Sequence, residues 1–150
     1  MYHKILVAVD QSPMSQAVFT AGLNLAKAFD AQILLLHVLS PEAPESPISY
    51  APYDTANLKA IEEAWNQYRK ESLAALQAWA ERAREQGVNA EIKQVAGNPA
   101  PSIVGIGHDW GADLIAMGRR GHSNWKEIVL GSVSSYVIHR SHCSIHLVQT

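Results

Sequence analysis

Short, uninterrupted apolar runs constrain the fold of this chain most strongly. Residues 5–9 read Ile-Leu-Val-Ala-Val, and residues 32–39 read Gln-Ile-Leu-Leu-Leu-His-Val-Leu. A strand with one face in water alternates apolar and polar residues, whereas a strand covered on both faces does not. Turn-forming residues follow both runs, Asp-Gln-Ser-Pro after the first and Ser-Pro after the second. The two runs therefore predict strands of a parallel sheet that helices cover on both sides.

Between and after these runs, hydrophobic residues recur with helical spacing. Ser12 and Pro13 are predicted as the N-cap and the first residue of a helix, and its apolar stripe begins at Met14. A longer stripe begins near Leu58 and ends at a predicted C-cap around Gly87. Core packing is the expected role of three large aromatic residues on this second helix, Trp65, Tyr68 and Trp79, and covering a base or contacting a partner is the alternative.

Three further strands are predicted, at residues 90–95, 113–117 and 144–149, and short helices precede the last two. The first of the three is more polar, which favours a place near the sheet edge. The order of elements predicts an α/β fold: a five-stranded, mostly parallel sheet with helices on both faces, in a single domain over residues 1–150. A proline-rich excursion at residues 40–57 has neither the apolar run of a buried strand nor the apolar spacing of a helix, and it is predicted to be flexible.

Charge and cysteine content argue against several classes of partner and compartment. The chain has 150 residues and a formal net charge of −2, which favours neither nucleic acid nor an anionic membrane as a partner. The N-terminal apolar run is shorter than a secretory signal or a membrane span requires. The single cysteine, Cys143, forms no internal disulfide and suits a reducing compartment. We therefore expect a cytoplasmic protein.

The segment after the fourth predicted strand has the composition of a phosphate-binding loop. Gly118 and Gly121 let the main chain approach a ligand closely, so that consecutive N–H groups can point into one concavity. Gly131 and Ser132 begin a helix, whose first N–H groups and dipole favour an anion. The loop leaves the carboxyl end of a strand, where parallel sheets bind their ligands. Its spacing differs from the P-loop pattern.

This loop resembles the nucleotide-binding motif of the ATP-binding branch of the universal stress protein family. Gly118, Gly121, Gly131 and Ser132 match the family's Gly-x2-Gly-x9-Gly-Ser spacing. Residues 4–12, 35–38 and 113–118 also resemble family segments, so the likeness covers nearly the whole chain outside about residues 40–55.

The resemblance implies a Rossmann-like, adenine nucleotide alpha hydrolase-like sheet with strand order 3-2-1-4-5. It implies ATP or AMP as the ligand, with or without Mg²⁺. It also implies a homodimer paired through the last strand, from Ser144 to Gln149.

Carried over residue by residue, the resemblance implies a role for each site position. Asp10 would contact the ribose or the adenine, and Ala8 and Val38 would hold the base. A helix cap or a turn with Ser12 is an equal alternative for Asp10, and the two roles are compatible. The ribose and phosphates would lie along a larger set: Met117, Gly118, Arg119, Arg120, Gly121, His122, Ser123, Asn124, Gly131, Ser132, Val133 and Ser134. Arg119 and Arg120 are not motif positions, although their charge suits a polyphosphate.

The favoured function is a regulatory module of the stress response that binds an adenine nucleotide and is read by a signalling partner. The alternatives are a slow ATPase or autophosphorylating enzyme, and a dimeric interaction protein that binds no nucleotide. Phosphoryl transfer needs Mg²⁺ held by carboxylates and a group that orients the nucleophile. Near the predicted phosphates the only acids are Asp10 and Glu127, and no base is evident, so no catalytic residue is assigned.

A histidine-rich stretch near the C-terminus raises the question of a metal. His139, His142, Cys143 and His146 lie within eight residues, and imidazole and thiolate are zinc ligands. His139 is expected in the last turn of a helix and His146 on a strand, and no ligand spacing emerges. We therefore expect no metal site.

Overall fold

Strands and helices alternate along the chain in the computed structural model, which describes residues 1–48, 58–119 and 130–149. The elements are β1 (Lys4–Ala8), α1 (Met14–Phe29), β2 (Gln32–Leu39), α2 (Leu58–Glu85), β3 (Ala90–Ala96), α3 (Pro99–Trp110), β4 (Leu114–Gly118), α4 (Ser132–Arg140) and β5 (Ser144–Val148). Every strand and helix predicted from the sequence is present, with ends that differ by one or two residues.

The five strands form one parallel sheet in the order β3-β2-β1-β4-β5. Val7 on the central strand β1 is in register with Leu35 on β2 and with Ala116 on β4. The predicted fold class and strand order are confirmed. β3 lies at one edge of the sheet, as its more polar sequence predicted.

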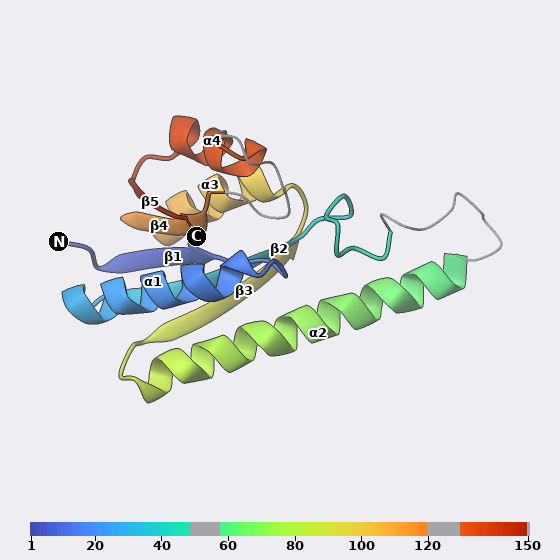
Figure 1. Ribbon diagram of the computed structural model, residues 1–150, viewed down its shortest axis with the longest axis horizontal. Helices are drawn as coiled ribbons and strands as arrows, with labels where there is room; N and C mark the ends of the chain where they lie inside the picture. Colours follow the sequence, from blue (N-terminus) through green and yellow to red (C-terminus); the bar gives the residue numbers. More distant parts are fainter. Residues whose placement is uncertain (49–57, 120–129, 150) are drawn as a thin grey trace.

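Helices cover both faces of the sheet, α1 and α2 on one side and α3 and α4 on the other (Figure 1). Alternate residues of β1 serve the two layers, because Ile5 and Val7 pack against α1 while Leu6 packs in the layer of α3. Val18 and Phe19 of α1 belong to the first layer. This double burial explains why the central strands lack the apolar-polar alternation of a half-exposed sheet.

The long helix α2 extends past the sheet toward the segment that follows β2 (Figure 1). Its buried residues, Ser72, Leu76, Ala80 and Ala83, all lie in its second half. Trp79 stacks on Phe19 with ring centroids 5.5 Å apart, which confirms a packing role for this aromatic residue. Within the described residues, no helix is both long and apolar enough to cross a membrane.

Residues 40–48 of the proline-rich excursion form successive turns, whereas residues 49–57 lie outside the described part of the chain. The main-chain N–H of Ala43 donates to the carbonyl oxygen of Ser40, and that of Ser46 donates to Ala43. Ser46 is fully buried. The described part of the excursion is therefore tied into the fold.

The predicted N-cap of α1 is wrong. The helix begins at Met14, and Pro13 occupies the cap position without a side-chain hydrogen bond to the helix. Ser12 contributes only its main-chain oxygen, which accepts from the N–H of Ser15. The carboxylate of Asp10 takes over the local hydrogen bonding, because its Oδ1 accepts from the N–H of Ser12 and the hydroxyl of Ser15.

Close packing of α1 on β1 leads to a testable prediction at Gly22. A Cβ at this position would lie 2.5 Å from Cγ2 of Val7, a buried and stiff side chain. We expect Gly22→Ala to lower the free energy of unfolding by about 1–3 kcal/mol, measured by urea denaturation. Gly105→Ala on α3 is the matched control, because its Cβ meets nothing within 4 Å; it should leave stability unchanged or raise it by up to about 1 kcal/mol. Equal effects would show that the packing of α1 is not tight at Gly22.

Candidate functional site

A pocket of about 570 Å³ lies at the carboxyl ends of β1, β2 and β4. Residues after β1 and the start of α1 line one side of it, and residues 40–45 line another. The first residues of α3 and α4 complete the lining. Parallel sheets commonly bind ligands at this edge.

Most of the predicted site residues within the described chain come together in this pocket. They belong to three strand ends and to the start of α4, segments far apart in the sequence. The predicted residues that line the pocket are Ala8, Asp10, Val38, Met117, Gly118, Gly131, Ser132, Val133 and Ser134.

Arg119 does not line the pocket, although it directly follows Gly118. Its guanidinium Nη1 donates to Oε1 of Gln149 at 3.2 Å, and its main-chain N–H donates to the carbonyl oxygen of Val148. The structure therefore directs this side chain toward the end of β5. The other predicted loop residues lie outside the described part of the chain: Arg120, Gly121, His122, Ser123 and Asn124.

Asp10 is held in a fixed orientation at the end of β1. Its Oδ1 accepts hydrogen bonds from the N–H of Ser12 at 2.8 Å and from Oγ of Ser15 at 2.9 Å, while its own N–H donates to the same Oγ at 2.8 Å. Ser15 is buried. The turn with Ser12 that the sequence offered as an alternative role is thus present, and it positions the carboxylate at the pocket wall.

The start of α4 presents main-chain donors to the pocket. Its cap residue, Gly131, has an extended conformation and no side chain with which to accept a hydrogen bond. The N–H groups of Ser132, Val133 and Ser134 have no partner inside the helix, as at any helix start. The positive end of the helix dipole lies at the same place. This arrangement favours an anion.

Ser134 contributes to the fold through its hydroxyl. Its Oγ donates to the carbonyl oxygen of Arg119, and its side chain is 2% exposed. The N–H of Gly131 donates to the same carbonyl oxygen at 3.1 Å. These two bonds fasten the start of α4 to the end of β4, so Ser134 offers the pocket its N–H group rather than its hydroxyl proton.

Sequence reasoning did not find several of the lining residues. Glu42 and Glu45 come from the excursion, which has no pattern that places it over the sheet. Asn98 and Pro99 follow β3, and the rule that ligands lie beyond strand ends could have identified them. The remaining lining residues that were not predicted are Met14, Ser15, Val18, Leu36, Ser40, Ala43, Pro44 and Ile103.

A buried polar cluster lies behind the pocket wall formed by residues 40–45. The hydroxyl of Tyr68 on α2 donates to Oε1 of Glu45 at 3.4 Å, and the Tyr68 ring meets the ring of His37 edge-on. Burial, and next the charge of Glu45, raise the pKa of Tyr68. The cluster joins the excursion to α2, whereas the sequence favoured core packing for Tyr68.

His37 is a neutral imidazole inside this cluster. The amide nitrogen of Gln94 donates both to Nδ1 of His37 and to the carbonyl oxygen of Arg69, each at 3.3 Å. Nδ1 is therefore an acceptor, and the proton sits on Nε2, which is buried and has no hydrogen-bond partner within the described residues. Burial lowers the pKa of His37, while the charges of Glu45 and Asp10 act in the opposite direction.

Comparison with known proteins agrees with the fold. The model of the universal stress protein family matches residues 1–149. The chain belongs to the universal stress protein family. It is 38% identical to universal stress protein YxiE of Bacillus subtilis over 149 residues, which cover 99% of this chain and 100% of YxiE. The solved structure of MJ0577, a protein of Methanocaldococcus jannaschii, is similar with a TM-score of 0.77 and 30% identity, covering 100% of this chain and 97% of that one.

Two solved structures with a similar fold hold nucleotides. A universal stress protein in complex with cAMP has a TM-score of 0.68 and 22% identity, and the alignment covers 99% of this chain and 98% of that one. A family member from Arabidopsis thaliana with AMP bound has a TM-score of 0.64 and 16% identity, with coverage of 97% and 90%. At these identities the likeness establishes the shared fold.

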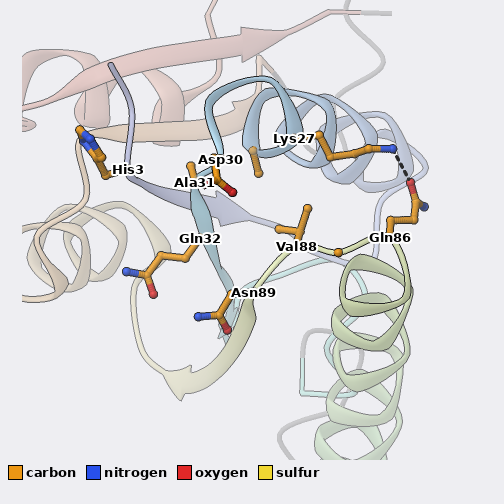
Figure 2. A pocket seen from close by; sticks show the side chains of 10 residues that line it. His3, Lys27, Asp30, Ala31, Gln32, Gln86, Val88 and Asn89 are labelled. Carbon is orange, nitrogen blue, oxygen red and sulfur yellow. Dashed lines mark hydrogen bonds between the residues drawn. The ribbon is translucent and has the colours of Figure 1, made fainter.

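A second pocket of this universal stress protein, of about 500 Å³, lies at the opposite, amino ends of β1 and β2. Figure 2 shows its side chains, among them Lys27, whose Nζ donates to Oε1 of Gln86 at 3.1 Å. No residue predicted for the nucleotide site lines this pocket. Its polar side chains come from loops, the end of α1 and the first residue of β2, without a helix start among them.

Two of the histidines near the C-terminus of this universal stress protein, His139 and His142, contact other groups. The ring of His142 meets that of His108 with centroids 5.7 Å apart, and Nδ1 of His139 lies 2.7 Å from the carbonyl oxygen of Ser135. In the described ranges, no group of three or more His, Cys, Asp and Glu side chains is arranged to hold a metal ion.

The lowered pKa of His37 predicts how stability depends on pH. In acid the unfolded chain binds a proton at His37 before the folded chain does, so its contribution is complete above about pH 6.5, the ordinary pKa of histidine, and is lost as the pH falls below it. We expect the free energy of unfolding to decrease between pH 7.5 and 5.5, and to decrease less in His37→Gln, as measured by urea denaturation. His142→Gln, at an exposed position, should follow the wild type. Equal pH dependence in His37→Gln and wild type would contradict the prediction.

Proposed function

We propose that this universal stress protein is a regulatory module that binds an adenine nucleotide, ATP or AMP, in the pocket at the carboxyl ends of β1, β2 and β4. The observation that carries the proposal is the start of α4, where Ser132, Val133 and Ser134 line the pocket and no side chain caps the helix. A phosphate would supply the acceptors that the helix start lacks.

The lining suits the other parts of a nucleotide. Ala8 and Val38 lie at the ends of adjacent strands. The last hydrogen bond between these strands joins the N–H of Val9 to the carbonyl oxygen of Leu36. Beyond it β1 turns away, whereas β2 continues. Val38 is two residues further along β2, so its main-chain groups point to the same side, into the gap that β1 leaves. The base would lie in this gap. Asp10, held by Ser12 and Ser15, would accept hydrogen bonds from the ribose.

The charge of the lining bears on how phosphates would be held. Among the described lining residues, Asp10, Glu42 and Glu45 are acidic, and none is a lysine or arginine. Main-chain N–H groups and the dipole of α4 would therefore supply most of the attraction within the described residues. The acidic side chains would repel the phosphates of ATP. Mg²⁺ bound to those phosphates would reduce this repulsion, and it forms part of the proposal for that ligand.

The comparisons support the class of ligand. A family member from Arabidopsis thaliana has AMP bound, and another universal stress protein has cAMP bound. These proteins share the fold of this chain, and the described motif residues here form a pocket at the edge of the sheet where such folds place ligands.

Assembly and location complete the proposal. β5 is the edge strand of the sheet, and we place a homodimer contact along residues 144–149. One module would occupy residues 1–150 and act in the cytoplasm, where its free Cys143 would stay reduced. A partner would read the difference between the bound and free forms. Binding is favoured over ATP hydrolysis, since the hydroxyl that lies beside the Asp10 carboxylate, that of Ser15, belongs to a buried residue and is engaged by the N–H of Asp10 in the turn.

A negative charge introduced at the start of α4 tests the proposal. Ser132 is exposed at the first position of the helix, where a carboxylate stabilises the helix dipole. Ser132→Asp should thus fold normally and yet repel phosphate, which lowers the affinity for ATP and AMP by about tenfold or more. Isothermal titration calorimetry measures the affinities, and circular dichroism confirms the fold.

Ser132→Ala is the matched control. It keeps the main-chain N–H groups and adds no charge, so its affinity should stay within about threefold of wild type, the value of a weak neutral hydrogen bond. Absence of any nucleotide binding by the wild type, or equal affinity in Ser132→Asp, would refute the proposed site.

A further inference from the structure

Asn98 stands at the junction of β3 and α3, on the rim of the nucleotide pocket. The N–H of the preceding residue, Gly97, donates to the carbonyl oxygen of Leu39 at 3.0 Å. This bond ties the junction to the end of β2, one residue beyond Val38. Asn98 and Val38 line the same pocket, so the side chain of Asn98 borders the gap proposed for the base.

The orientation of the Asn98 amide is fixed by the helix that it caps. Its Oδ1 accepts a hydrogen bond from the N–H of Ala100 at 3.3 Å, and Pro99 has no N–H to offer. An amide nitrogen is only a donor, so Nδ2 could not take the place of Oδ1 opposite another N–H group. Nδ2 therefore points away from α3, and no described residue accepts a hydrogen bond from it.

The strand order places Asn98 on the far side of the base from the phosphates. The start of α4, where the phosphates are proposed, follows β4, on one side of β1; β2 and then β3 lie on the other side. A nucleotide that runs from α4 to Val38 would thus direct toward β3 the edge of the base that is remote from the ribose. In adenine this edge carries the exocyclic amine, a donor, next to a ring nitrogen that is an acceptor.

We propose that Asn98 determines base specificity by pairing with this edge of adenine. Nδ2 donates to the ring nitrogen, and Oδ1 accepts from the exocyclic amine while it still caps α3, since a carbonyl oxygen has two lone pairs. The inference rests on the proposed nucleotide function and adds the residue that selects the base. In the major groove of DNA, asparagine forms a bidentate pair of the same kind with adenine, through the amine and the ring nitrogen N7 on its other side.

The capping bond is what makes this pairing selective. A free asparagine amide can turn over and present its donor and acceptor in either order, so it can match adenine or hypoxanthine. Asn98 cannot turn over, because its amide N–H would then face the N–H of Ala100, donor against donor. Hypoxanthine has a carbonyl oxygen in place of the amine, and this oxygen would face Oδ1, acceptor against acceptor.

The test compares AMP with IMP, which differ only at this edge of the base. We expect the wild-type full chain to bind AMP about 5- to 50-fold more tightly than IMP, which lies within the range of discrimination by a bidentate asparagine–adenine pair. The upper end of that range is not expected because the Asn98 side chain is solvent-accessible. Asn98→Ser keeps a capping oxygen but lacks the amide, so AMP and IMP should bind about equally well. Isothermal titration calorimetry gives both affinities.

Asn98→Asp separates the cap from the base contact. Aspartate caps a helix as well as asparagine does, so the thermal midpoint of the free protein should not fall. Its second carboxylate oxygen would face the ring nitrogen of adenine, and the preference for AMP over IMP should drop at least about fivefold. Asn89→Ser, in the pocket at the opposite end of the strands, should leave both affinities unchanged.

The outcomes distinguish this inference from the function on which it rests. Wild-type preference for AMP that persists in Asn98→Ser and Asn98→Asp overturns the role of Asn98 and leaves nucleotide binding in place. A wild type that binds AMP and IMP equally also overturns it. A wild type that binds neither nucleotide, nor ATP, overturns the proposed function and this inference together.

Discussion

Burial of the central strands on both faces is the constraint on which the rest of the structure depends. Ile5, Leu6 and Val7 on β1 are all 0% exposed, although neighbouring side chains point to opposite layers. Nearly every position in β1, β2 and β4 must therefore be apolar, and groups that bind a polar ligand have to lie beyond the strand ends. Because parallel strands end at the same edge of the sheet, their polar continuations meet there. The pocket is a consequence of this geometry.

Two helices that begin at this edge use the same feature differently. At α3 the side chain of Asn98 accepts from the first available N–H group, so the fold itself satisfies part of the helix start. At α4 the cap is Gly131, which leaves the corresponding N–H groups to the pocket. The hydroxyl of Ser134 meanwhile secures α4 to the end of β4. A helix start can thus remain open to a ligand when other bonds hold the helix in place.

His37 is the exception to the apolar rule, and its position explains why it is tolerated. It lies near the carboxyl end of β2, where the sheet gives way to the pocket, and Gln94 on the paired strand β3 satisfies its Nδ1. Beside it, the hydrogen bond between Tyr68 and Glu45 connects the excursion after β2 to α2. Departures from simple patterning of this kind concentrate near functional sites.

The sequence by itself determined the number, type and approximate ends of the elements, because the periods of apolar residues and the turn residues between them are local properties. The glycine spacing after residue 117 also led to the start of α4. It offered both Asp10 and Ser12 as residues that could organise the start of α1 and did not decide between them, since both side chains can accept the same kind of bond and only the folded turn selects Asp10. Likewise the sequence does not indicate that the hydroxyl of Tyr68 bonds to Glu45, because the two residues are distant along the chain and only the fold brings them together.

Tertiary structure alone decided which segments share the pocket. Residues 40–45 have no pattern that distinguishes them from an ordinary connector, and the position of Asn98 after a strand only makes it one candidate among several. They share the site because β2 and β3 are neighbours in the sheet. Which strands become neighbours depends on the packing of helices on both faces at once, a non-local balance that periodicity along the chain does not record. The sequence thus identified the elements and one wall of the site, whereas the opposite wall, with Asn98 and the excursion, required the assembled sheet.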